Sequence, residues 1–157
     1  MTDPILPAFD PLTLPESNAS IIPPPFDAGN LKRWNRRLGN HAGLTRFGVN
    51  LTRVEPGGQT SYRHAHTEQD EFVWVLEGEV VLVTDAGEQT LSAGHCAGFP
   101  HGTGDGHQFL NRTDRDVFLL VVGDRTPGDR VTYSDDDLAG TPTPGSYRFT
   151  RKDGSPL

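Results

Sequence analysis

From Leu44 to about Val122 the sequence alternates short apolar stretches with turn residues, and this pattern constrains the fold more than any other feature. Glycine, proline, aspartate and asparagine mark the turns, as in Glu55-Pro-Gly-Gly58 and Asp85-Ala-Gly87. Roughly eight short strands without intervening helices predict an all-β chain folded as an antiparallel sandwich or barrel. The expected strands are Thr45–Val54, Thr60–Ala65, Glu71–Leu76, Glu79–Thr84, Glu88–Leu91, His95–Phe99, His107–Leu110 and Asp116–Gly123.

The sequences on either side of this β region differ from it in composition. Residues 1 to about 28 carry most of the thirteen prolines and show no strand or helix period, which predicts a stiff, extended arm. Its apolar residues favour an ordered arm that lies against the rest of the chain: Phe9, Ile21, Ile22 and Phe26. We therefore divide the chain into a Pro-rich arm with a short helix (1–43), a β-barrel (44–123) and a C-terminal extension that packs on the barrel (124–157).

Short helices are expected in both flanking regions. Asn30 is suited to cap a helix over Leu31–Leu38 that Gly39 ends, although an irregular or strand-like segment fits this stretch nearly as well. Its basic residues are expected on a solvated face: Lys32, Arg33, Arg36 and Arg37. Ser134 is suited to cap a solvated helix that begins at the acidic run 135–137.

Strand alternation predicts which side chains of the stretch 71–76 face the barrel interior. If Glu71 points inward, Val73 and Val75 do as well, while Phe72, Trp74 and Leu76 point outward. An outward row of large apolar side chains needs a cover, which the arm or a second subunit would supply. We expect a homodimer.

The charge balance and the single cysteine limit the partners and the compartment. A formal net charge of −7 argues against a nucleic-acid-binding face and against adhesion to anionic membranes. Cys96 cannot form an internal disulfide and is expected to be a small buried residue of a strand. The N-terminal residues lack the pattern of a secretory signal, and we expect a soluble, cytoplasmic protein.

Metal-ligating residue types cluster between Gly58 and Gly78. His64 and His66 lie two residues apart, so on a strand both imidazoles face the same side. Glu71 follows after a short turn and is placed to supply a carboxylate ligand, although a one-residue slip would give that role to Asp70. A mixed nitrogen and oxygen ligand set suits a divalent transition metal.

These residues belong to two longer motifs. The first is Gly58-x5-His64-x-His66-x4-Glu71-x6-Gly78, and the second is Gly94-x5-Pro100 followed by Gly104-x2-His107-x3-Asn111. Over roughly residues 45 to 123 the chain resembles the cupin superfamily, and the first motif matches at every position. In the second motif the interval from proline to histidine is two residues longer, which affects the loop 101–106 and the mouth of the pocket.

The resemblance implies a single cupin domain, a double-stranded β-helix or jelly-roll barrel, with one metal held inside by His64, His66, Glu71 and His107. His101 is a poorer choice for the fourth ligand. The metal would be a divalent transition ion such as Zn, Fe, Mn or Ni, and four protein ligands leave two positions of an octahedral ion open. A metal that only stiffens the fold is the alternative. The regions 38–138 and 150–156 also look like a group of small bacterial single-domain cupins, whose members are labelled only as cupin-domain proteins or, by fold analogy, as sugar-phosphate isomerases.

Strand parity suggests which residues line the pocket. Tyr62 shares a face with His64 and His66, so its hydroxyl is a candidate acid/base group or a substrate hydrogen-bond donor. The candidate substrate-binding residues are Phe109, Val73, Val75, His101 and Asn111. Arg46 and Arg53 are possible donors to a substrate phosphate, whereas Arg63 has the wrong parity. Asp105 and His101 would form the rim.

Three classes of function are compatible with this site. The first is an isomerase, epimerase or lyase that polarises a small sugar-like or carboxylate metabolite on the metal. The second is a non-haem iron dioxygenase, which would use the same ligands. The third is a non-catalytic cupin that binds a sugar or another metabolite.

Overall fold

The computed structural model describes residues 7–26 and 32–157, and this part of the chain is built almost entirely of β-strands. Two short helical segments are present among these residues, the 3₁₀ turn η1 (Pro11–Thr13) and α1 (Leu38–His41). The strands are β1 (Arg33–Arg37), β2 (Phe47–Val54), β3 (His64–His66), β4 (Glu71–Glu77), β5 (Glu79–Thr84), β6 (Gly87–Ser92), β7 (Cys96–Phe99), β8 (Gln108–Leu110), β9 (Val117–Asp124), β10 (Val131–Tyr133), β11 (Ala139–Thr143) and β12 (Ser146–Thr150).

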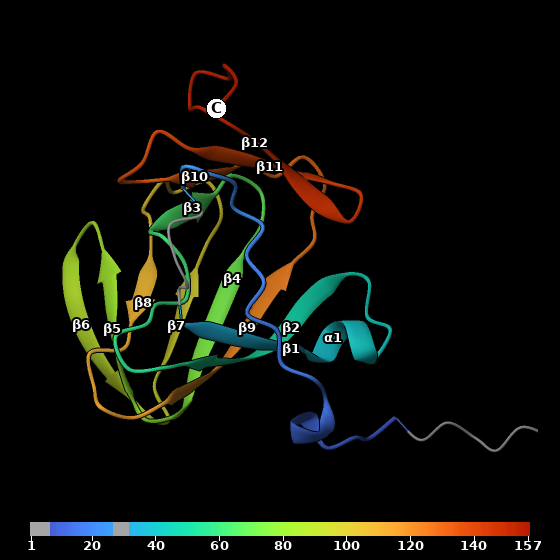
Figure 1. The fold of residues 1–157 in the computed structure, drawn as a ribbon, viewed down its shortest axis with the longest axis vertical. Coiled ribbons are helices and arrows are strands. Elements are labelled where there is room, and N and C mark those ends of the chain that lie inside the picture. The colour runs from blue at the N-terminus through green and yellow to red at the C-terminus, as the bar shows by residue number, and fades with distance from the viewer. Residues whose placement is uncertain (1–6, 27–31) are drawn as a thin grey trace, which may run out of the picture.

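The strands form antiparallel sheets that wrap around one core (Figure 1). The largest sheet has the order β1-β2-β9-β4-β7, and the other two have the orders β12-β11-β10-β3 and β6-β5-β8. Isolated bridges at Gln59–Leu110 and His64–His107 join the second and third sheets. The expected all-β barrel is confirmed, and the strands from β2 to β9 lie within a few residues of their predicted positions, apart from the shorter β3.

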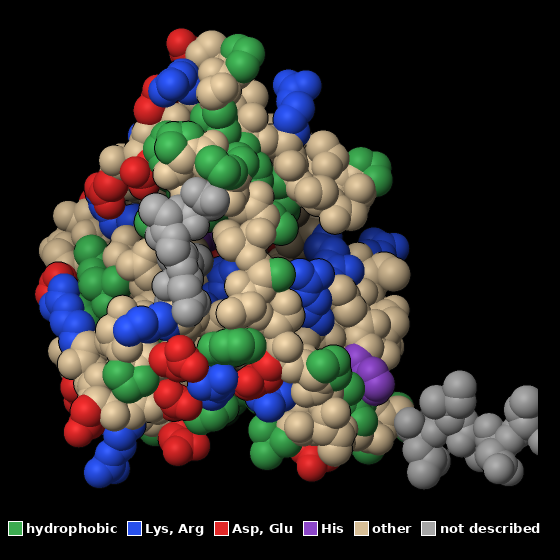
Figure 2. Space-filling view, in the orientation of Figure 1, with side chains coloured by type: hydrophobic (Ala, Val, Ile, Leu, Met, Phe, Trp, Pro, Cys, Tyr) green, Lys and Arg blue, Asp and Glu red, His purple; other side chains and the backbone are tan. Residues whose placement is uncertain are grey.

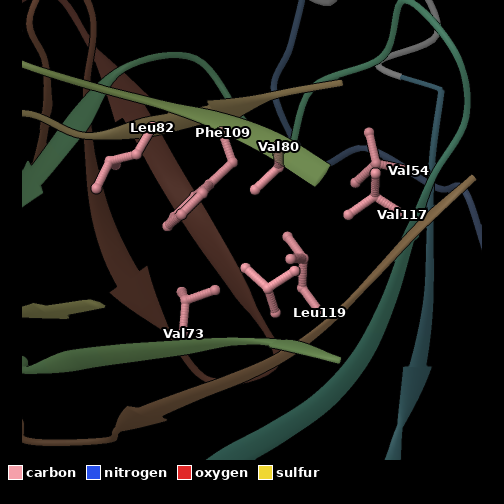
Figure 3. Close-up of a cluster of buried hydrophobic side chains, with 8 residues drawn as sticks. Val54, Val73, Val80, Leu82, Phe109, Val117 and Leu119 are labelled. Atoms are coloured by element: carbon pink, nitrogen blue, oxygen red, sulfur yellow. The ribbon is translucent and has the colours of Figure 1, made fainter. Parts of the chain in front are cut away.

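The core is made of inward-facing side chains from both sides of the barrel (Figure 3). Val73 and Val75 of β4 are buried there, as strand parity predicts. The cluster also contains Val54, Val80, Leu82, Phe109, Val117 and Leu119. Most of these side chains are β-branched, and such residues pack well on a pleated surface. The predicted outward row is also observed, because Phe72, Trp74 and Leu76 are each more than a third exposed.

The hairpin from β4 to β5 requires the glycine that ends the first motif. Gly78 has a φ of +87°, and a Cβ placed there would lie 3.1 Å from the backbone oxygen of Asp116. A larger residue would therefore be strained both by its backbone conformation and by the neighbouring chain. Gly78 is thus needed for the turn that leads out of β4.

The segment around residues 32–38 differs from the helix that was considered for it. Residues 33–37 form the edge strand β1, which pairs with β2 from Arg33–Val54 to Arg37–Asn50. Pairing with β2 outweighs the modest helix propensity of the segment. Asn30 and Leu31, the proposed beginning of that helix, lie outside the described residues.

Two further predictions are wrong. Residues after Ser134 form a turn instead of a helix, because Tyr133 N donates to Leu138 O and the fully buried Leu138 leads the chain into β11. Cys96 lies in a strand, as expected, but is exposed. It pairs in register with Trp74, so its side chain belongs to the outward-facing row.

Part of the N-terminal segment lies along the barrel (Figure 1). Ser17 pairs with Asn35 of β1, and Ile22 is buried against Val131, Tyr133 and Leu138. This contact brings residues 19–22 to one wall of the cavity described below. Among the described residues, no helix has the length and apolar character that a membrane span requires.

Candidate metal centre

The side chains of His64 and His107 are brought together by direct backbone pairing. His64 N donates to His107 O at 3.1 Å, and His107 N donates to His64 O at 2.9 Å. Two residues that exchange both bonds in an antiparallel pair point their side chains to the same side. The rings lie with their centroids 4.7 Å apart. Residues distant in sequence are thus held in one cluster by the barrel closure.

His66 and Glu71 complete this cluster. Alternation along β3 places His66 on the face of His64, and β4 begins with Glu71 after a short turn. The Nε2 atoms of His64, His66 and His107 lie 3.8, 3.7 and 3.5 Å from Glu71 Oε2. Atoms that share one ion at about 2.1 Å lie roughly 3 to 4 Å apart, so this spacing fits a common metal. The ligand atoms of His64, His66 and Glu71 all lie within 4.8 Å of one another.

Hydrogen bonds from the outer ring nitrogens orient two of the imidazoles. His66 Nδ1 lies 2.7 Å from Oδ2 of Asp129, a fully buried carboxylate. His64 Nδ1 lies 2.9 Å from both the backbone oxygen of Tyr62 and Ser61 Oγ. With an acceptor at Nδ1, that nitrogen carries the proton and Nε2 keeps its lone pair. Both Nε2 atoms are therefore prepared to bind a cation.

His107 provides the observation that best tests the fit of a metal. Its side chain is almost fully buried, and among the described residues neither ring nitrogen has a hydrogen-bond partner. The ring stacks on Phe99, with centroids 3.7 Å apart and an angle of 9° between the planes. Leaving a buried polar atom unpaired costs about 1–3 kcal/mol, which a bond from Nε2 to a metal would offset. The residues therefore fit a bound divalent cation.

The electrostatics of the cluster also favour a cation. Burial raises the pKa of Glu71, but the neighbouring His107 and His64 imidazoles outweigh burial and hold the pKa well below its usual range. Glu71 is therefore ionised at neutral pH. Burial lowers the pKa of His107, which keeps that imidazole neutral. An anionic carboxylate beside a neutral imidazole is the protonation state in which these residues bind metal.

The cluster opens into a cavity of about 350 Å³. Its apolar wall includes Val73, Phe109, Val121 and Val131, and two tyrosines, Tyr133 and Tyr147, also line it. A smaller cavity of about 250 Å³ on the side of Asp70 and Asp124 shares His66, Glu71 and Tyr147 with it. A cavity of this size accommodates a small metabolite next to the metal ligands.

Comparison with known proteins places the chain in a family. The profile of the cupin domain matches residues 50–123. A sugar phosphate isomerase of the cupin superfamily from Silicibacter pomeroyi is 48% identical, with a TM-score of 0.91 and 96% of each chain covered. This chain is a member of the cupin superfamily.

Other solved structures resemble it less closely. A protein from Acidithiobacillus ferrooxidans, named provisionally as a sugar phosphate isomerase, is 26% identical over 80% of each chain, with a TM-score of 0.72. A polyketide cyclase from Streptomyces resistomycificus is 24% identical over 76% of this chain and 80% of its own, with a TM-score of 0.61, and shares the fold alone. The search of curated proteins found no match.

The tyrosine predicted from strand parity does not line the cupin cavity. The backbone around Ser61 bends and β3 begins only at His64, so alternation does not extend back to Tyr62. The side chain of Tyr62 instead packs against the second buried cluster, which contains Val131 and Leu138. Tyr133 and Tyr147 take the positions on the cavity wall. Both strands follow the cupin motifs in sequence: β10, with Tyr133, pairs with β3, and β12, with Tyr147, lies at the far edge of the same sheet.

Two other predicted substrate-binding residues have structural roles. Asn111 is buried, and its Nδ2 donates to the backbone oxygens of Val54 and Arg115, so it fixes the turn after β8. Val75 lies in the barrel core and not on the cavity wall. Val73 and Phe109 do line the cavity.

The loop 101–106, inside the second motif, carries the remaining predicted residues. Gly102 and Gly104 both have positive φ, and Gly102 N donates to His66 O, so the turn occurs at Gly102 and the extra residues follow it. His101 is exposed and pairs with Asp70, away from the four clustered ligands. Asp105 accepts a hydrogen bond from Asp85 N on the outer surface.

The arginines are arranged differently from the prediction. Arg53 is paired with acidic residues on the outer face of β2, and Arg63 pairs with Asp85 and Asp135. Arg33 and Arg37, which were expected on a solvated face, line the cavity. Asp129 was not predicted as part of the site, and its only sequence signal is its position in Thr126-Pro-Gly-Asp-Arg130.

Proposed function

We propose that this cupin is a metal-dependent enzyme of the isomerase, epimerase or lyase type that acts on a small sugar-like metabolite. The observation that carries the proposal is the convergence of three imidazole Nε2 atoms on Glu71 Oε2 at 3.5–3.8 Å, next to a cavity. His64, His66, His107 and Glu71 would hold one divalent cation. When bound, this cation would supply Lewis-acid polarisation of a substrate carbonyl or hydroxyl. The name of the Silicibacter pomeroyi relative supports a sugar phosphate as the substrate class.

The protein's own groups would orient the substrate and supply protons. Burial and the nearby Tyr147 raise the pKa of Tyr133 to about 12, so its hydroxyl stays protonated at neutral pH. Burial likewise raises the pKa of Tyr147. Both hydroxyls would therefore donate hydrogen bonds to substrate oxygens and would not act as bases. Phe109 and Val73 exclude water from the inner wall.

The experiment combines metal analysis with an exchange assay. Protein purified without chelators is analysed for metal and then incubated in D₂O with a panel of aldose and ketose phosphates. An enzyme that moves a proton at carbon incorporates deuterium, and this incorporation should disappear after chelator treatment. Tight substrate binding without conversion or exchange would instead support a non-catalytic binding protein. Substrate-dependent oxygen consumption by an iron-loaded sample would support the dioxygenase alternative.

His64→Ala tests the ligand assignment. We expect the variant to lose most of its bound metal while keeping the barrel, because His64 lies at the cavity wall and not in the apolar core. Metal content by mass spectrometry and the thermal unfolding midpoint measure the two effects. His101→Ala is the matched control, since this imidazole is exposed outside the cluster. Unchanged metal content in His64→Ala would refute the assignment.

A further inference from the structure

The edge strand β1 presents different chemistry on its two faces. Arg33, Asn35 and Arg37 alternate along the strand and all line the metal-bearing cavity. Trp34 and Arg36, the residues between them, belong to the other face: Trp34 Nε1 donates to Glu55 and Arg36 pairs with Glu16. The period of two therefore places two guanidinium groups of one short strand in the same cavity.

The arginines on the two faces also differ in their partners. On the outer face, Glu16 accepts from both Arg36 and Arg53, with distances of 2.6 and 2.9 Å. Among the described residues, neither Arg33 nor Arg37 pairs with a carboxylate. Arg33 donates from Nη1 to the backbone oxygen of Thr60 at 2.5 Å, but its Nε is buried and has no partner in the described chain. A buried, unpaired guanidinium N–H is a donor available to a ligand.

The charge of the cavity is opposite in sign to that of the protein. The chain carries a formal charge of −7. Among the described residues two arginines, Arg33 and Arg37, and one carboxylate, that of Glu71, line the cavity, so these groups give the wall a net positive charge. A bound divalent cation would increase this charge. Basic side chains gather near the middle of the face shown in Figure 2. The cavity thus attracts anions, although the surface as a whole repels them.

We propose that Arg33 and Arg37, with Asn35 between them, form a subsite for the anionic group of the ligand, and that this group is a phosphate monoester. Guanidinium forks match phosphate oxygens, and the two guanidinium charges of this subsite match a doubly charged phosphate better than a singly charged carboxylate. Asn35 Oδ1 accepts from Thr52 Oγ1 at 2.8 Å, which leaves its amide N–H groups for the ligand. The subsite rests on the proposed function in that the ligand enters the metal-bearing cavity, but it is formed by residues outside the metal cluster.

The experiment measures binding of inorganic phosphate, with acetate as the carboxylate comparison, by calorimetry at low ionic strength. Chelator-treated and metal-loaded samples are compared so that phosphate bound to the metal is distinguished from phosphate bound to the arginines. The variants are Arg33→Gln and Arg37→Gln, and Arg112→Gln, at an exposed ion pair with Glu88 outside the cavity, is the matched control. Losing charged hydrogen bonds should weaken phosphate binding about tenfold or more in Arg33→Gln. Arg37, which is more exposed, should give a smaller loss, and Arg112→Gln should stay within about twofold of the unmodified protein.

A second measurement does not depend on the folding of any variant. In the unmodified protein labelled with ¹⁵N, the Nε–H resonance of Arg33 should shift as phosphate is added and should shift less with acetate. Equal phosphate affinity in Arg33→Gln, or an Arg33 resonance that does not respond, would overturn the proposal. Stronger binding of acetate than of phosphate would reject the phosphate monoester and indicate that the anionic group of the ligand is a carboxylate. Phosphate binding that persists in metal-free protein supports the subsite even if the protein shows no metal-dependent catalysis. Metal-dependent catalysis without phosphate binding in the metal-free protein would reject the subsite and leave the proposed function standing.

Discussion

His66 depends for its orientation on a carboxylate that lies more than sixty residues further along the chain. Asp129 is fully buried, and its two oxygens have separate tasks. Oδ2 accepts from His66 Nδ1 at 2.7 Å, while Oδ1 accepts from the backbone N–H groups of Glu68 and Gln69. One side chain thus fixes both the imidazole and the turn that leads to Glu71. Outer partners of metal-bound histidines raise the basicity of the ligand and hold the ring in place.

Asp129→Asn separates these two tasks. The amide oxygen can still accept from the turn, but the NH₂ group cannot accept from His66 Nδ1–H. We expect metal affinity to fall by about 10- to 100-fold, with the unfolding midpoint changed far less than the affinity. Competition with a coloured chelator measures the affinity. Asp153→Asn, which changes an exposed acid whose Oδ1 accepts from the backbone N–H of Ser155, is the control, and equal affinities in the two variants would show that Asp129 does not position the ligand.

Among the elements, the N-terminal segment and β1 together form one wall of the site. Glu16 links this segment to the barrel, because its carboxylate bonds to Arg36 of β1 and Arg53 of β2. All three side chains are less than a fifth exposed, so the network is only partly screened by solvent. The same segment then continues to Ile22, which packs beside the cavity. Anchoring at Glu16 therefore supports the wall that contains Arg33.

The Glu16 network predicts a pH-dependent stability. A hydrogen bond from Arg53 is the main cause that lowers the pKa of Glu16 below its usual value of 4.5. A lowered folded-state pKa means that the stabilisation is fully present above about pH 4.5 and is lost as the pH falls through the folded-state pKa. Glu16→Gln should therefore reduce the free energy of unfolding by roughly 1–2 kcal/mol at pH 7, with a smaller difference below pH 4.

Denaturant unfolding at several pH values measures this effect. Glu88→Gln is the control, because Glu88 forms an ion pair with Arg112 in which both side chains are about half exposed. Such a pair contributes little in water. A difference between Glu16→Gln and the unmodified protein that is the same at pH 7 and pH 3 would contradict the prediction.

At the scale of the whole molecule, the outer face of the largest sheet has an exposed apolar row at β4 and β7. Phe72, Trp74 and Leu76 on β4 are 40%, 46% and 44% exposed, and Cys96 lies opposite Trp74. The described part of the N-terminal segment does not cover this row, because its contacts are with β1, β2 and the second buried cluster. We propose that a second copy of the chain covers this apolar row and that the two copies form a homodimer through it.

Trp74→Glu tests the homodimer. The substitution places a charge in the centre of the apolar row, so we expect the variant to sediment as a monomer while the unmodified protein sediments as a dimer. Sedimentation velocity over a range of concentrations measures the difference. Leu12→Glu is the control, since Leu12 is 62% exposed outside this face. A monomeric unmodified protein would reject the proposal.

The sequence by itself determined the features that depend on local periodicity. Alternation along a strand is a property of consecutive residues, so it predicted the burial of Val73 and Val75 and the outward direction of Trp74. The same rule places His64 and His66 on one face. The spacing also suggested Glu71, and the resemblance to the cupin motifs implied His107, and the structure brings both to the two histidines. The same rule failed at Tyr62, because the predicted strand began at Thr60 whereas the observed strand β3 begins only at His64.

Only the tertiary structure decided which distant segments meet at the site. Nothing near Asp129 in sequence indicates that it reaches His66, since the contact depends on how β10 pairs with β3. Arg33 and Arg37 line the cavity because β1 pairs with β2, although the segment alone was equally compatible with a helix. Pairing between strands far apart in sequence depends on the free energy of the whole packed barrel, which no local pattern records.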